Sequence, residues 1–130
     1  DLIDAYKLLA EVELELNNVD KALEYCQHSL ELAQEVEDQE FEGIAYRVLG
    51  QIHRAAGRLK EARQHLHNSV EILTTIGNKL ELGKSCYELG VTLSLMGSEQ
   101  GRVQLQQAIQ IFEELGVEGE LEKAQAALES

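Results

Sequence analysis

Long hydrophobic runs and basic side chains are what this sequence has least of. No window of about 18 consecutive apolar residues occurs in the chain, so we expect no membrane-spanning helix. The start of the chain also lacks the basic and then apolar stretch of a signal peptide. The 11 Lys and Arg residues are outnumbered by 24 Asp and Glu residues, and the formal net charge is −13. Contact with phosphates needs a basic surface, so this charge argues against generic binding to nucleic acids or anionic membranes.

Cysteine is scarce as well. Cys26 and Cys86 are the only two in 130 residues, which is too few for a disulfide framework. Two reduced, buried, structural thiols are compatible with a reducing compartment, so we expect a cytoplasmic protein. Because the first residue is Asp1 and not Met, we also expect the chain to be a fragment of a longer protein.

What the sequence does contain is an internal repeat. A shift of 40 residues places Ala5 on Ala45 and Leu9 on Leu49, and after Gly97 the best shift becomes 39. Each unit carries two stretches with apolar residues at helical spacing, so we expect an all-α domain of about seven antiparallel helices. Such hairpins bury a continuous core only by stacking on one another, which is the logic of a solenoid. The single domain, 1–130, divides into units of about 1–39, 40–79 and 80–118, with a partial fourth unit or capping helix at 119–130.

Residues that favour a left-handed backbone mark the expected helix ends. Gly57, Gly77 and Gly97 are suited to this conformation, and Asn17 takes the same position in the first unit. Asn78 followed by Glu81 has the spacing of a capping box and predicts the start of the next helix.

The repeated pattern resembles the tetratricopeptide repeat (TPR) family. Its signature is a large residue, then Leu-Gly, a helix-ending Gly, and small residues seven apart in the second helix. The second unit matches the signature at Tyr46, Leu49-Gly50, Gly57, Ala62 and Ser69. The resemblance covers essentially the whole chain and implies a right-handed α-α superhelix. It also explains Gly50, since a small residue there lets a neighbouring helix approach closely; Ala10 and Gly90 fill the same position.

Two departures from the family pattern are visible. The period is 39–40 residues instead of 34, as in the longer TPR variants of kinesin light chains and large bacterial signalling proteins. The usual Pro at the end of the second helix is absent, since the chain has no Pro. These departures leave the expected fold intact but weaken any transfer of ligand type.

The sequence offers little for catalysis or metal binding. A segment ending in Gly83-Lys84-Ser85 approaches the phosphate-binding P-loop, but it has five residues between its glycines instead of four and lies within an expected helix. His65 and His67 are two apart and point to different faces of a helix. Neither a zinc ligand set nor a nucleophile with a base is evident, so we expect no enzyme, metal or cofactor. The acidic residues around 35–42 predict a solvated edge, with weak calcium binding as the alternative.

The resemblance implies a ligand groove lined by the first helix of each unit. The second unit is the only one with a net positive charge, and Arg47, Gln51 and Arg54 share one helix face in it. Arginine grips carboxylates in a bidentate way, which favours an acidic ligand. The alternative is that both arginines pair with Glu11, Glu15 or other acidic neighbours. The predicted peptide-binding residues are Lys7, Arg47, Gln51, Arg54, Lys84 and Tyr87.

We therefore expect a module that binds a peptide or protein segment, within a cytoplasmic and bacterial signalling or regulatory protein. The carboxylate clamp of chaperone-binding TPRs is not expected, because Glu11, Tyr87 and Val91 stand where its Asn and basic residues belong. The alternative is a structural spacer or a self-assembly segment. Leu2 and Leu9 lie in a first helix for which we expect no cap, and two copies could bury this end against each other.

Overall fold

The computed structural model describes all 130 residues and consists of seven α-helices joined by short turns. The all-α fold and the number of helices predicted from the sequence are confirmed. None of the helices combines the length and apolar character needed to cross a membrane. The helices are α1 (Leu2–Glu15), α2 (Val19–Glu35), α3 (Gln39–Ala55), α4 (Leu59–Ile76), α5 (Lys79–Leu95), α6 (Gln100–Leu115) and α7 (Glu118–Glu129).

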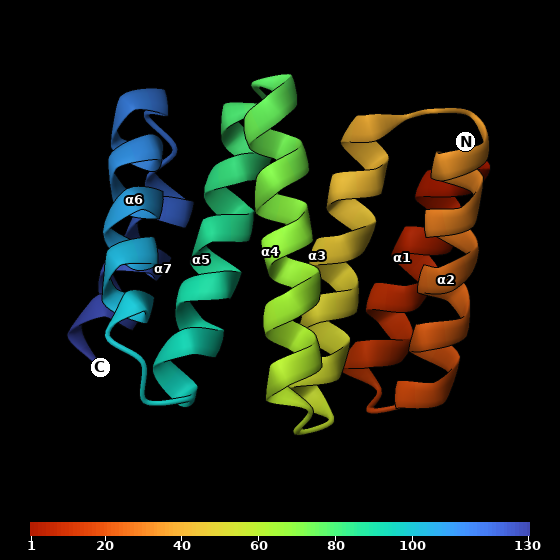
Figure 1. The fold of residues 1–130 in the computed structure, drawn as a ribbon, viewed down its shortest axis with the longest axis horizontal. Helices are drawn as coiled ribbons and strands as arrows, with labels where there is room; N and C mark the ends of the chain where they lie inside the picture. The colour runs from red at the N-terminus through yellow and green to blue at the C-terminus, as the bar shows by residue number, and fades with distance from the viewer.

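The helices form two layers. Each helix packs against the next one in the chain, and Figure 1 shows the resulting row from α1 and α2 at one end to α6 and α7 at the other. Helices α1, α3, α5 and α7 also contact one another in that order, whereas α2, α4 and α6 do not touch one another. The odd-numbered helices therefore form the tighter, inner layer of a curved solenoid, and the junctions between them form the floor of its inner face.

The turns use the left-handed backbone that the sequence predicts. Positive φ angles occur at each of the four predicted positions, which are Asn17, Gly57, Gly77 and Gly97. Glu37 has the same conformation, with a φ of 58°, although no glycine or asparagine marks that turn. A residue other than glycine pays a steric cost there, so the α2–α3 turn departs from the residue preference seen at the other turns.

Gly50 sits where α4 packs closely against α3, as predicted. A Cβ atom at Gly50 would collide with Cγ of Leu66 on α4 and lie 2.8 Å from its Cδ2 atom. Gly90 is in the same situation, because its Cβ would lie 2.7 Å from Cγ of Leu105. The close packing offsets the low helix propensity of glycine.

The core runs along the contact between the two layers. One cluster joins α1, α2 and α3 around Cys26 and Ile52, and another joins α5, α6 and α7 around Cys86 and Phe112. Both cysteines are buried free thiols, as predicted, and lie on helices that do not touch. Burial raises the pKa of Cys26 to about 12 and that of Cys86 to about 11, so both stay protonated.

The start of α1 differs from the prediction, whereas α5 starts after Asn78 as predicted. The expectation that α1 has no cap is wrong, because the Asp1 carboxylate accepts a hydrogen bond from the backbone N–H of Asp4 at 3.1 Å. At α5 the Asn78 side chain accepts from the backbone N–H of Glu81, at 3.2 Å. Glu81 does not complete the box, since its carboxylate binds Arg47 instead.

Candidate functional site

Two arginines join α3 to α5 on the inner layer. Arg47 donates from Nη2 to Oε1 of Glu81 at 2.7 Å, and from Nη1 to the backbone oxygen of Glu81 at 3.1 Å. Two helical turns further along α3, Arg54 makes the equivalent bonds to Glu88. Its Nη2 atom donates to Oε1 at 2.6 Å, and its Nη1 atom donates to the backbone oxygen at 3.1 Å. We call these two arrangements the clasps. Each clasp joins one arginine of α3 to one glutamate of α5, and the two clasps lie seven positions apart on both helices.

The clasps are largely withdrawn from solvent. The side chain of Arg47 is 12% exposed and that of Glu88 is 8% exposed. Burial by itself would raise the pKa of Glu81, but the Arg47 guanidinium, helped by Lys84, holds that pKa below its usual range. The sequence left two roles open for Arg47 and Arg54: binding a ligand carboxylate, or pairing with acidic side chains of the chain itself. In the structure both arginines form ion pairs within the chain. Their partners are carboxylates of α5 and not Glu11 or Glu15.

A chain of hydrogen bonds continues from the first clasp into the core. Arg47 Nη1 donates to Oγ of Ser85 at 3.3 Å. The two hydroxyls of Ser85 and Ser69 lie 2.7 Å apart, and Ser69 donates to the backbone oxygen of Gly43 at 2.6 Å. Because the Ser69 hydroxyl donates its one hydrogen to the backbone oxygen of Gly43, the Ser85 hydroxyl must be the donor to Ser69. This relay fixes α3, α4 and α5 to one another through two fully buried serines.

The junction between α5 and α7 has no clasp. The repeat places Ser94 where the middle junction has Arg54, and Ala127 where it has Glu88. Both replacements are short, and a hollow of about 480 Å³ opens there. We call it the α5–α7 hollow; six of its nine lining residues are hydrophobic, and its walls include Tyr87, Val91, Ser94, Leu95, Lys123 and Ala127.

A smaller polar hollow of about 170 Å³ adjoins it and shares Tyr87 and Lys123 with it. The Lys123 ammonium lies 4.9 Å from the centre of the Tyr87 ring, within the range of a cation–π contact. Burial raises the pKa of Tyr87, and nearby Glu88 and Glu120 act in the same direction, so the phenol stays neutral. The polar hollow is lined by Glu11, Arg47, Gln51, Lys84, Tyr87, Glu88, Glu120 and Lys123.

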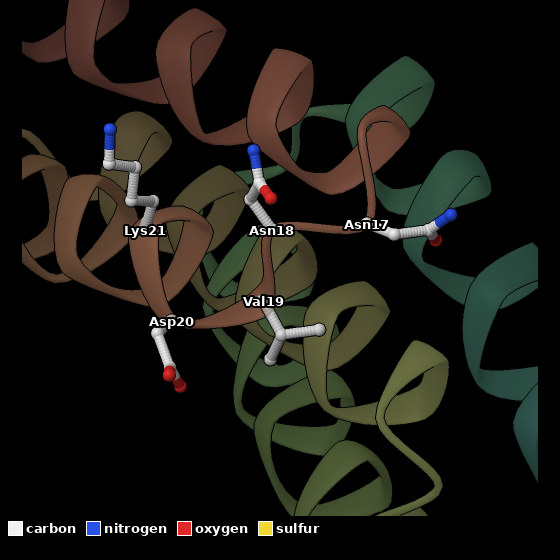
Figure 2. Close-up of a pocket in the computed structure, with 5 residues that line it drawn as sticks. All are labelled: Asn17, Asn18, Val19, Asp20 and Lys21. Atoms are coloured by element: carbon white, nitrogen blue, oxygen red, sulfur yellow. The ribbon is translucent and has the colours of Figure 1, made fainter.

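Other hollows and polar clusters are less suited to a ligand. A hollow of about 520 Å³ lies at the α1–α2 turn, but its side chains diverge, and Figure 2 shows Asp20 and Lys21 pointing in opposite directions. His53 and His65 stack at 5.1 Å between α3 and α4. No group of three or more His, Cys, Asp or Glu side chains is placed to hold a metal ion. The segment Gly83-Lys84-Ser85 lies inside α5, where backbone N–H groups serve the helix.

A family model described as "Tetratricopeptide repeat" matches residues 1–75, which is more than half of the chain. The chain belongs to the tetratricopeptide repeat family. A search of curated proteins found no match.

A crystal structure with the same TPR fold comes from Pyrococcus horikoshii. It is described as a Signal Transduction ATPase with Numerous Domains (STAND) protein with a tetratricopeptide repeat sensor. The TM-score is 0.79 at 22% sequence identity, over 97% of this chain and 20% of that one. The chain therefore spans about a fifth of the length of that protein. At this identity the likeness concerns the TPR solenoid fold alone.

The predicted groove residues divide into two sets within the TPR solenoid. Arg47, Gln51, Lys84 and Tyr87 come together at the polar hollow, and their role in binding stays a prediction. Arg54 lies outside that hollow in the second clasp. Lys7 also lies outside it and pairs within its own helix, 3.6 Å from Asp4 and 3.3 Å from Glu11.

Tyr87 is the one predicted site residue that lines the α5–α7 hollow, and the hollow itself is not among the sequence predictions. Its signal is present in the sequence, because Ser94 and Ala127 break the pattern that Arg54 and Glu88 set one TPR unit earlier. Reading that signal needs the knowledge that Arg54 reaches Glu88, and only the folded structure supplies this contact.

Proposed function

We propose that this chain binds an extended peptide or protein segment on its inner face, at the α5–α7 hollow and the polar hollow beside it. TPR repeats generally mediate protein–protein interactions or scaffolding. One observation supports this location above the others: the clasps bridge the α3–α5 junction, whereas the α5–α7 junction has no clasp and holds a largely apolar hollow. Gln51, Lys84 and Tyr87 are the proposed ligand contacts, joined by Lys123. Arg47 and Arg54 then act as positioning residues that hold α5 in place.

An acidic ligand remains part of the proposal, but its partners are lysines. Lys84 lies 3.6 Å from Glu81, a carboxylate that Arg47 already engages, and the Lys84 side chain is 35% exposed. Lys123 makes no ion pair and extends over the Tyr87 ring. Both ammonium groups can therefore meet a ligand carboxylate without breaking a clasp.

A selection from a phage-displayed random peptide library tests the proposed function. We expect the native chain to enrich related sequences, and the Lys84→Glu/Lys123→Glu variant to lose them. Lys21→Glu/Lys60→Glu makes the same change of charge at two exposed positions of the outer layer and is the matched control. Absence of enrichment by the native chain, or equal enrichment by the variant, would contradict the proposal.

A second candidate function, self-assembly, is favoured by the surface of α1. Leu2 and Leu16 are 61% and 62% exposed and lie on one face of the helix with Leu9 and Val12, which are also exposed. Burying this face against a second copy would remove apolar area from water. Light scattering across a range of concentrations tests it: a dimer that Leu9→Glu dissociates supports self-assembly, and a monomer throughout opposes it.

The proposed setting is a cytoplasmic signalling protein. Its two cysteines are buried free thiols, as expected in a reducing compartment. The TPR sensor of the Pyrococcus horikoshii STAND protein offers an analogy for a role in signalling, at the level of fold.

A further inference from the structure

We infer that the α5–α7 hollow is a socket for one aliphatic side chain of a peptide that carries a carboxylate on a neighbouring residue. This inference rests on the proposed function and names the class of ligand. It concerns a feature particular to this chain, since the socket exists because one junction of the inner layer lacks the side chains that fill the junction before it.

The shape of the socket follows from two short side chains. At the α3–α5 junction the long Arg54 side chain crosses to Glu88, and its guanidinium also donates to Oγ1 of Thr92 at 3.2 Å. At the α5–α7 junction neither Ser94 nor Ala127 can reach across. The space that a clasp occupies in one junction is thus available to a ligand in the next.

The walls of the socket select an apolar occupant. Val91, Leu105, Ala126 and Ala127 all line it, and Leu95 stands at its edge with 62% of its surface exposed. An exposed leucine beside an apolar hollow gains from any side chain that covers it, because the contact removes both surfaces from water. A branched aliphatic side chain suits these walls, because six of the nine lining residues are hydrophobic.

The charge at the socket selects an acidic neighbour. Lys123 is the only charged side chain among the lining residues, and it has no carboxylate partner. The Lys123 ammonium lies over the Tyr87 ring, and both residues line the apolar socket as well as the polar hollow. A peptide with its aliphatic side chain in the socket places the adjacent residue beside this cation, where a carboxylate is attracted and an ammonium is repelled.

Four labelled peptides test the socket by fluorescence anisotropy. They share a Gly-Ser background and carry one central pair: Leu-Glu, Leu-Lys, Ser-Glu or Ser-Lys. We expect the 130-residue chain to bind the Leu-Glu peptide about tenfold or more tightly than each of the others. Equal binding of all four, preference for Leu-Lys, or no binding of the Leu-Glu peptide overturns the inference.

A transplanted clasp provides the decisive variant. Ser94→Arg/Ala127→Glu puts the Arg54 and Glu88 side chains into the corresponding positions, and we expect it to weaken binding of the Leu-Glu peptide about tenfold or more. Thr74→Arg/Gln106→Glu introduces the same charges at exposed positions of the outer layer and should leave that binding unchanged. Circular dichroism checks whether both variants remain helical.

Leu95→Ala covers the case in which the transplant fails to fold. Leu95 is mostly exposed, so its truncation spares the core, and we expect the affinity for the Leu-Glu peptide to fall several-fold. Affinity that survives both Leu95→Ala and a folded transplant contradicts the socket. Library peptides that bind the native chain and the transplant equally well would sustain the proposed function while the socket fails, so the two failures are distinguishable.

Discussion

The α3–α5 and α5–α7 junctions are formed by corresponding positions of the same repeat, but one is bridged by side chains and the other is not. The first is closed by two ion pairs, Arg47–Glu81 and Arg54–Glu88. The second is open, with an apolar hollow of about 480 Å³ on its floor. The comparison teaches that one position of the repeat can hold neighbouring units together or leave room for a ligand, depending on the length of its side chain.

The difference continues beneath the inner face. Ser69 and Ser85 carry the hydrogen-bond relay at the middle junction, whereas the corresponding positions one unit later are Ala108 and Ala124. All four are fully buried. Buried hydroxyls need partners, and the serines meet this need by bonding to each other and to backbone oxygen.

The first junction, between α1 and α3, follows a third pattern. Lys7 and Leu14 take the positions of the two arginines, with Phe41 and Val48 in place of the two glutamates. Leu14 packs against the cluster that contains Val48. This junction is closed by apolar contact, so the clasped middle junction is the only one of the three that is joined by ion pairs.

Breaking a clasp should have the largest effect on stability. Glu88→Ala leaves the Arg54 guanidinium half-buried without its carboxylate, and we expect a loss of about 2–4 kcal/mol in the free energy of unfolding. Urea denaturation followed by circular dichroism measures it. Glu129→Ala, at an exposed position with no ion pair, is the control and should leave the midpoint unchanged. Equal effects of the two substitutions would mean that the clasps do not hold the junction.

Interrupting the relay should cost less. Ser85→Ala removes the donor to Ser69 and one acceptor for Arg47, and we expect a loss of about 1–2 kcal/mol. The reverse change one unit later, Ala124→Ser, introduces a buried hydroxyl into a wholly apolar cluster and should also destabilise the fold. If Ser85→Ala proves neutral in urea denaturation, the relay contributes nothing to the middle junction.

Acid should weaken the clasped junction selectively. Arg47 and Lys84 face Glu81 and hold its pKa below the usual value of 4.5. A carboxyl whose pKa is lowered by folding contributes stability above its unfolded pKa, and this contribution is lost as the pH falls from about 4.5 through the lower folded pKa. Urea denaturation of the native chain and Glu81→Gln at several pH values checks this. Their difference should be full at pH 7 and shrink below pH 4.5; a difference independent of pH would contradict it.

The transplanted clasp should change stability least. Ser94→Arg/Ala127→Glu adds an ion pair at an exposed edge, and such pairs contribute about 0–1 kcal/mol. We expect a thermal midpoint equal to or slightly above that of the native chain. A clearly lower midpoint would indicate that the α5–α7 junction cannot accommodate the geometry of the middle one.

The helices, most turns and the close packing at Gly50 could be predicted because they depend on local residues. Periodicity marks a helix, and a glycine marks a left-handed turn, within a few positions of the feature itself. The left-handed turn at Glu37 could not be predicted, because glutamate has no preference for a positive φ. The cap at Asp1 could be read from its acceptor side chain, three residues before the Asp4 N–H.

The candidate site was harder to predict because it depends on side-chain reach. Arg47 and Arg54 were correctly placed on the inner layer, but their partners lie 34 residues away on another helix. Only when those contacts are known does Ser94 stand out as the position where a clasp arginine is absent. The hollow can therefore be predicted only by comparing two units, since neither Ser94 nor Ala127 indicates it without Arg54 and Glu88 for comparison.

The most direct test of the account is a map of where a peptide binds. Backbone amide resonances of the chain are followed by NMR while the Leu-Glu peptide is added. The account predicts shifts concentrated at Leu95, Lys123 and Ala126, with little change at Arg54, which lines neither hollow. Shifts concentrated around Arg54 instead, or on the outer helices, would contradict the claim that the open junction is the binding site.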